Sequence, residues 1–165
     1  MAIREIVTYP DARLRAMAEP VARFDDALRI LARNLLDTMR AAPGIGITAP
    51  HIGILKRLVV LEIPGQNGAK TYANPEIIWV SDEKIRHQEG SVSMPGEVEE
   101  VERHARIRIR YQDVDGIEQM EESEGLLAVC HQHEIDQLNG IFWLERLSRL
   151  RRDRLIKRYQ KQLRL

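Results

Sequence analysis

The residues best suited to chemistry lie on one short helical stretch near the C-terminal third of the sequence. His133 and Gln137 are four residues apart, and Glu134 follows His133 directly. In an H-E-x-x-H pattern, two histidines at this spacing hold a zinc-like ion on one helix face, and the glutamate handles the proton of an attacking water. Gln137 stands where the second histidine is expected, and a neutral amide oxygen binds such an ion more weakly than an imidazole does. The stretch therefore indicates a metal hydrolase with an altered ligand set.

A glycine-rich segment at residues 44–51 is the second feature with a chemical use. Its small residues let the backbone approach another chain closely. The Gly-Lys-Ser/Thr ending of a phosphate loop is absent, and so is a dinucleotide fingerprint of three spaced glycines. We expect a strand that lines a peptide groove at Gly44 and Gly46, with an ordinary turn as the alternative.

Three helices and several strands must position these residues. Apolar spacing predicts an amphipathic helix from Asp25 to Ala42, a central helix from Ser123 to the C-terminal cap Gly140, and a basic helix from Glu145 onward. Strands are expected at residues 58–63, 71–80, 83–88 and 103–111, and a hairpin turn at 113–116. In the last strand charged and apolar residues alternate, so its arginines are expected to face water.

Composition limits the class of protein. The 165 residues have a formal net charge of zero and 44% apolar residues, which predicts a single domain over residues 1–165 and no global basic field for nucleic acid. A single cysteine, Cys130, excludes an intramolecular disulfide and fits a reducing compartment. No signal sequence and no run of about twenty apolar residues is present, so a cytoplasmic protein without a membrane span is expected.

Three separated segments together resemble the peptide deformylases, which remove the formyl group from the N-terminal methionine of nascent chains. The family motifs Gly-x-Gly-x-Ala-Ala-x-Gln, Glu-Gly-Cys-x-Ser and Gln-His-Glu-x-Asp-His-Leu correspond in order to residues 44–51, 89–93 and 132–138. The likeness covers essentially the whole chain. It implies an α+β, peptide-deformylase-like fold in which antiparallel or mixed sheets surround the H-E-x-x-H-type helix, with a basic C-terminal helix outside.

The resemblance also assigns candidate metal ligands. The family holds its ion with one cysteine and two histidines, and these positions are Ser91, His133 and Gln137 here. A serine hydroxyl stays protonated near neutral pH and is a far weaker soft-metal ligand than a thiolate. We therefore expect no tightly bound metal. In the alternative, one divalent ion (Fe, Ni or Zn) binds a site rebuilt with His51.

The remaining site residues follow from the same resemblance. Glu134 matches the general acid/base, His51 replaces the glutamine that helps to stabilise the oxyanion, and the Val92 N–H remains an oxyanion donor. The residues that match peptide-contacting positions are Gly44, Ile45, Gly46 and Gly90, with Arg103 as a further groove residue.

Two functions from different classes are consistent with these residues. The first is a deformylase-like protein, a pseudoenzyme with a degraded metal site, that binds an N-terminal peptide or the ribosome, the latter through its C-terminal basic helix. The second is an active hydrolase of N-formyl or other N-acyl amides in N-terminal protein processing during translation. A serine nucleophile at Ser91 is a third, weaker idea, because no nucleophile elbow is evident.

Overall fold

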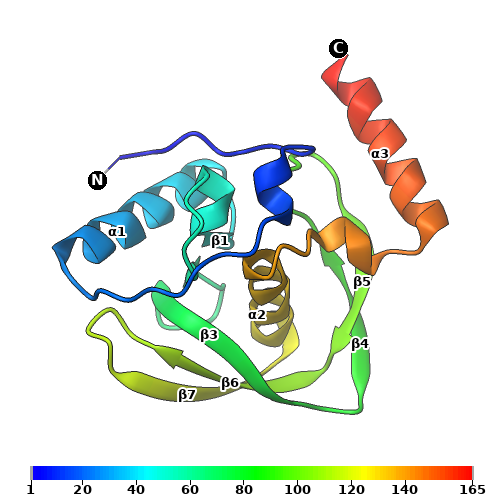
Figure 1. Cartoon of the computed structure of the whole chain (residues 1–165). Helices are drawn as coiled ribbons and strands as arrows, with labels where there is room; N and C mark the ends of the chain where they lie inside the picture. Colours follow the sequence, from blue (N-terminus) through cyan, green and yellow to red (C-terminus); the bar gives the residue numbers. More distant parts are fainter. Residues whose placement is uncertain (1, 165) are drawn as a thin grey trace.

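Helix α2 (Gly125–Leu138) runs through the middle of the molecule, and strands pass beneath and beside it (Figure 1). The computed structural model describes residues 2–164. The other two α-helices are α1 (Asp26–Ala41) and α3 (Arg149–Leu163), and short 3-10 helices span Ala12–Arg15, Ala49–Ile52 and Trp143–Arg146. The strands are β1 (Gly46–Thr48), β2 (Leu58–Leu61), β3 (Lys70–Val80), β4 (Lys84–Glu89), β5 (Glu99–His104), β6 (Arg106–Gln112) and β7 (Glu118–Glu124).

The strands form two sheets in which every strand pair is antiparallel. One sheet has the order β1-β2-β3-β6-β7, and the other consists of β4 and β5. Among the described residues, β1 pairs only with β2 and is therefore an edge strand. This arrangement confirms the expected α+β fold, with antiparallel sheets around a central helix and a basic helix outside (Figure 1).

Helix α1 covers the β1–β2 end of the larger sheet. Its first turn is capped by Asp25, whose carboxylate accepts a hydrogen bond from the Leu28 N–H, as an N-cap residue does. Leu35 and Met39 are fully buried against Ile47. The amphipathic helix expected from Asp25 to Ala42 is thus confirmed, apart from its capping residues.

Helix α2 is enclosed on nearly all sides. Its apolar residues Ala128, Ile135 and Leu138 pack against the larger sheet. Its buried polar residues are His131, Gln132, Glu134, Asp136 and Gln137. Because a buried polar group is costly without a partner, each of these five side chains must be hydrogen-bonded or serve a ligand.

The single strand predicted over residues 103–111 is wrong. The chain leaves the smaller sheet at His104 and enters the larger one at Arg106, and the Ala105 N–H between them donates to the Glu83 carbonyl. Arginines of β6 face outward as expected, whereas Arg103 of β5 is buried.

The C-terminal helix begins later than predicted. Ser148 caps it, and Glu145 lies in the preceding 3-10 helix. Among residues 2–164, no helix has the length and apolarity required to cross a membrane.

Candidate active site

A cavity of about 390 Å³ lies between α2, the edge strand β1 and the segment 90–97. It is lined by most of the predicted site residues: Gly44, Ile45, Gly46, His51, Gly90, Ser91, Val92, His133 and Glu134. Helix α2 contributes the last two, and the loop after β4 contributes Gly90 to Val92. The fold thus brings together residues from all three sequence segments.

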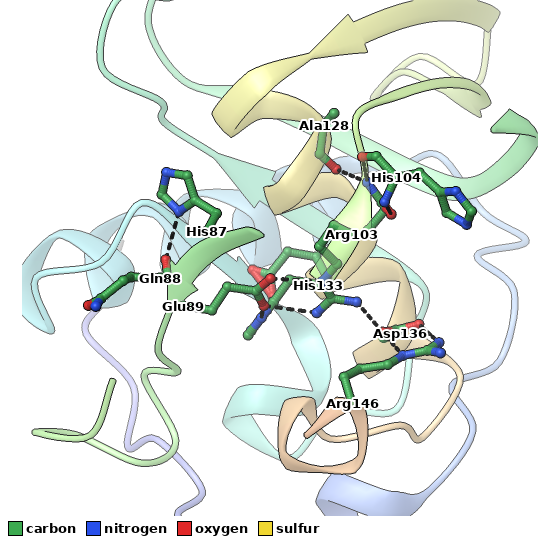
Figure 2. A network of polar contacts seen from close by, with 11 residues as sticks. His87, Gln88, Glu89, Arg103, His104, Ala128, His133, Asp136 and Arg146 are labelled. Atoms are coloured by element: carbon green, nitrogen blue, oxygen red, sulfur yellow. Dashed lines mark hydrogen bonds and ion pairs between the residues drawn. The ribbon is translucent and has the colours of Figure 1, made fainter. Parts of the chain in front are cut away.

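A buried chain of charges fixes His133. Its Nδ1 lies 2.8 Å from Glu89 Oε1 and therefore donates to that carboxylate. Arg103 donates two hydrogen bonds to Glu89 and a third to Asp136, which also accepts two from Arg146 (Figure 2). These contacts hold the imidazole with Nε2 at 3.7 Å from Glu134 Oε1.

Ion pairing determines the pKa values of Glu89 and His133 in this buried network. Burial alone would raise the pKa of Glu89, but hydrogen bonds from Arg103 and His133 lower that pKa to about 2. Burial lowers the pKa of His133, but its bond with Glu89 and the nearby Glu134 carboxylate outweigh burial and raise the pKa above the ordinary value. Glu89 is therefore a fixed carboxylate that orients His133.

Glu134 is the buried acid/base candidate at the floor of the cavity. It is 3% exposed, and its Oε1 has no hydrogen-bond partner among the described residues. Burial raises its pKa to about 7, despite the opposing effect of His133. A carboxyl group with a pKa near neutrality can both accept and donate a proton at physiological pH.

His51 lies in the same cavity on the 3-10 helix Ala49–Ile52. The residue is 1% exposed, and its Nδ1 accepts a hydrogen bond of 2.9 Å from the Thr48 N–H. Burial, followed by repulsion from His133, lowers the pKa of His51 to about 3, so the ring is neutral. Its Nε2 is buried and has no hydrogen-bond partner within residues 2–164.

The other two predicted metal ligands have different surroundings. Ser91 lines the cavity, and its Oγ accepts from the Ser93 N–H at 3.1 Å. Gln137 does not line the cavity. Its amide nitrogen donates to the Leu14 carbonyl at 2.8 Å, which attaches α2 to the N-terminal segment.

Val92 and Cys130 also line the cavity, and only Val92 offers a group that could bind a ligand. The Val92 N–H makes no hydrogen bond within residues 2–164, so it is free to donate to a ligand. Burial raises the pKa of the Cys130 thiol, which keeps it protonated, as expected for a small buried hydrophobe.

Arg103 requires a correction. It was predicted to contact a peptide in the groove, but its side chain is 4% exposed, does not line the cavity and is committed to Glu89 and Asp136. A buried guanidinium needs carboxylate partners. Arg103 therefore acts indirectly, by pairing with Glu89, which in turn orients His133. The sequence analysis did not identify Glu89 as a residue that orients His133. The one sequence feature that pointed to it is its position as the first residue of the motif at 89–93.

The His133-Glu134 pair on a buried helix beside a cavity corresponds to the first half of an H-E-x-x-H motif, and Gln137 stands in place of the second histidine. The family model described as polypeptide deformylase matches residues 3–153. The chain belongs to the peptide deformylase family.

Individual relatives support this assignment. A protein of Brucella melitensis named peptide deformylase-like is 76% identical over 161 residues, or 98% of each chain. A protein of Phenylobacterium zucineum named peptide deformylase is 44% identical over 164 residues, covering 98% of this chain and 97% of that one. The crystal structure of peptide deformylase from Ehrlichia chaffeensis in complex with actinonin superposes with a TM-score of 0.94 at 37% identity, covering 100% of both chains.

The metal ion that the family implies does not fit the residues present here. Ser91 offers a protonated hydroxyl, and Gln137 is turned to a backbone carbonyl. His51 Nδ1 is already an acceptor for a backbone N–H, which leaves the ring hydrogen on Nε2. Within the described residues, no three His, Cys, Asp or Glu side chains are grouped so that they could hold an ion.

Proposed function

We propose that this chain is a peptide-binding member of the peptide deformylase family that lacks the ordinary metal-dependent activity. The observation that carries the proposal is the donor set around His133. One ligand position holds the hydroxyl of Ser91, and the other holds Gln137, whose amide is committed to Leu14. Structural zinc sites draw roughly 10 kcal/mol or more from a full ligand set, so losing two of three ligands removes most of that affinity.

The cavity supports the peptide-binding part of the proposal. Gly44, Ile45 and Gly46, at the start of β1, line a space of about 390 Å³, and β1 is the terminal strand of its sheet. An extended peptide can add to such an edge through main-chain hydrogen bonds, while its side chains enter the cavity. The opposite wall, which contains Gly90 and Val92, supplies the unused Val92 N–H.

The ribosome is a second proposed partner, through the outer face of α3. Arg149 is 89% exposed on its side chain. Arg151 and Arg158, by contrast, are paired with acidic residues of the segment 97–99. Cosedimentation with ribosomes at low and high salt tests this role, since phosphate contacts weaken steeply with salt.

Hydrolysis of an N-acyl amide is the competing function. The observation in its favour is Glu134, which is retained, is buried and has a pKa near 7, as suits a general base. A relative at 44% identity also carries the name peptide deformylase. Turnover of a formyl-Met peptide by the wild-type protein would support this function.

The decisive experiment restores the family ligands with Ser91→Cys and Gln137→His together. We expect the wild-type protein to give no turnover of formyl-Met-Ala-Ser, and the double variant to bind about one equivalent of metal and to release formate. Each single variant is the matched control, because two ligands in place of three should not suffice. Turnover by the wild-type protein with bound metal would refute the proposal.

A further inference from the structure

A smaller hollow of about 120 Å³ lies between α3 and the two 3-10 helices Ala12–Arg15 and Trp143–Arg146. We call it the Arg152 hollow, after the α3 residue at its border. Three apolar side chains that are at most 4% exposed form its floor: Leu14, Phe142 and Leu144. None of its lining residues lines the cavity beside α2, so the two spaces are separate.

The walls of the Arg152 hollow are fixed by contacts on several sides. The Tyr9 N–H donates to the Ser93 carbonyl at 2.8 Å, and the Leu14 carbonyl accepts from Gln137. The Tyr9 ring stacks on Phe142, with ring centroids 5.7 Å apart and an angle of 16° between the planes. The hollow is therefore preformed, and a ligand can enter it without the cost of ordering its walls.

Two arginines border the hollow without a carboxylate partner. Arg15 is exposed and Arg152 is partly buried, and neither guanidinium is in an ion pair or a side-chain hydrogen bond within residues 2–164. The only acidic residue of α3, Asp153, faces Arg149 at 3.9 Å. A guanidinium binds carboxylates through a planar fork of donors, and here two such forks are unused.

The two carboxylates that border the hollow are already engaged. Asp11 accepts two hydrogen bonds from the Arg13 side chain, at 3.1 and 2.9 Å, and a third from the Arg13 N–H. Glu145 accepts a hydrogen bond of 3.1 Å from the Phe142 N–H. The uncommitted charge at the hollow is therefore positive and suits an anionic group.

We propose that the Arg152 hollow binds a small carboxylic acid with an apolar body, whose carboxylate pairs with Arg152 and Arg15. The apolar floor takes the body of the ligand. Sites for drug-sized ligands measure about 300–1,000 Å³, so a hollow of about 120 Å³ suits a single ring or a short branched chain. This inference goes beyond the proposed peptide binding and does not depend on it, because the two sites share no residue.

Methyl NMR of the wild-type protein during a titration with phenylacetate tests the site and its location. We expect saturable shifts for the methyl groups of Leu14, Leu144 and Ile156, which line the hollow, and none for Val92 and Leu126, which line the other cavity. The neutral 2-phenylethanol and the cationic phenethylamine have the same ring and should bind at least about fivefold more weakly, because neither offers an anion to the arginines.

Arginine variants test the role of the charges. We expect Arg152→Gln to weaken phenylacetate binding by about tenfold and Arg15→Gln, at the more exposed position, by about threefold. Arg154→Gln is the matched control, because Arg154 is exposed on the same helix and does not line the hollow. The methyl spectrum of each variant also reports whether it is folded.

Four results would overturn the proposal. The first is the absence of saturable shifts in the wild-type protein, and the second is a response of the Val92 and Leu126 methyls in place of those at the hollow. Equal binding of phenylacetate and 2-phenylethanol would exclude recognition of a carboxylate. Wild-type affinity in both Arg152→Gln and Arg15→Gln would exclude a role for the two arginines.

Discussion

Gly46 faces the carboxylate of Glu134 so closely that no side chain fits between them. A Cβ on Gly46 would lie 2.6 Å from Glu134 Oε2 and 2.9 Å from Leu61 Cδ2. We expect Gly46→Ala to displace Glu134, to weaken peptide binding by about tenfold and to lower the free energy of unfolding by about 1–3 kcal/mol. Calorimetric titration and urea unfolding measure both effects. Wild-type binding by Gly46→Ala would contradict this account of the cavity floor.

Gln137 donates a buried hydrogen bond to the backbone carbonyl of Leu14. Replacing it with Leu leaves the Leu14 carbonyl without the donor that now lies at 2.8 Å. We expect Gln137→Leu to lower the free energy of unfolding by about 1–3 kcal/mol, the cost of an unsatisfied buried acceptor. Urea unfolding measures it, and Gln66→Leu, in an exposed loop, is the control with a change below about 0.5 kcal/mol. Equal effects of the two substitutions would refute the structural role of Gln137.

At the residue scale, the sequence predicted which positions meet at the cavity but not how their atoms are used. Ser91, His133 and Glu134 lie there because motif order determines their place in the fold. The partner of Gln137 is 123 residues away in sequence, so spacing carries no information about it. The tautomer of His51 depends on one N–H that only the folded turn supplies.

Helix α3 holds the outer wall of the cavity in place. Arg158 donates to Glu97 at 3.2 Å, and the Gln162 side chain lies against Gly96, where an added Cβ would be 2.6 Å from its Nε2. Glu97 and Gly96 both line the cavity. Helix α3 therefore contacts the cavity wall directly through Arg158 and Gln162.

Removing these contacts should loosen the wall without unfolding the protein. We expect the backbone amides of residues 96–99 to exchange hydrogen about fivefold faster, or more, in the Arg158→Ala, Gln162→Ala variant, because local stability follows local contacts. Arg154→Ala, on the exposed face of the same helix, is the control. Unchanged exchange in residues 96–99 would show that α3 does not support the wall.

Glu121 of β7 connects three elements and makes stability depend on pH. Burial alone would raise its pKa, but hydrogen bonds from His131 of α2 and Lys70 of β3 lower it to about 2. Since this folded-state pKa is below the unfolded value of about 4.3, the contribution is complete above about pH 5 and is lost as pH falls toward 2.

The corresponding variant is Glu121→Gln. We expect it to be less stable than wild type by about 1–2 kcal/mol at pH 7, with the difference shrinking at pH 3. Urea unfolding at pH 7, 5 and 3 measures the difference. A difference that stays constant over this range would show that the charge of Glu121 does not stabilise the fold.

Elements were predicted well where a single periodicity governs them. Helix α1 follows apolar spacing, and Asp25 caps it as expected. Helix α2 is followed at its C-terminal end by the expected Gly140, but it begins at Gly125 and not at the predicted Ser123, because β7 continues through Glu124. The strand at 103–111 was wrong because a period of two continues through Ala105 while the chain changes sheets. Alternation reports which side chains point inward, not which sheet receives them.

At the scale of the whole molecule, the α+β framework of the family is retained around an altered donor set. The likeness to the Ehrlichia chaffeensis structure covers 100% of the chain. The fold class was predictable because three motifs in order specify it. The hydrogen bonds of His51 and Gln137 were harder to predict. His51 accepts from the backbone N–H of Thr48, and Gln137 donates to the carbonyl of Leu14, which lies outside the three motifs.

In the proposed function, the cavity binds its ligand without the metal ion of the family. Elemental analysis of protein purified without oxygen, in parallel with turnover of formyl-Met-Ala-Ser, tests this. We predict less than about 0.1 equivalent of Fe, Ni or Zn and no release of formate. About one equivalent of metal together with turnover would contradict the account and would require a metal site built from other donors.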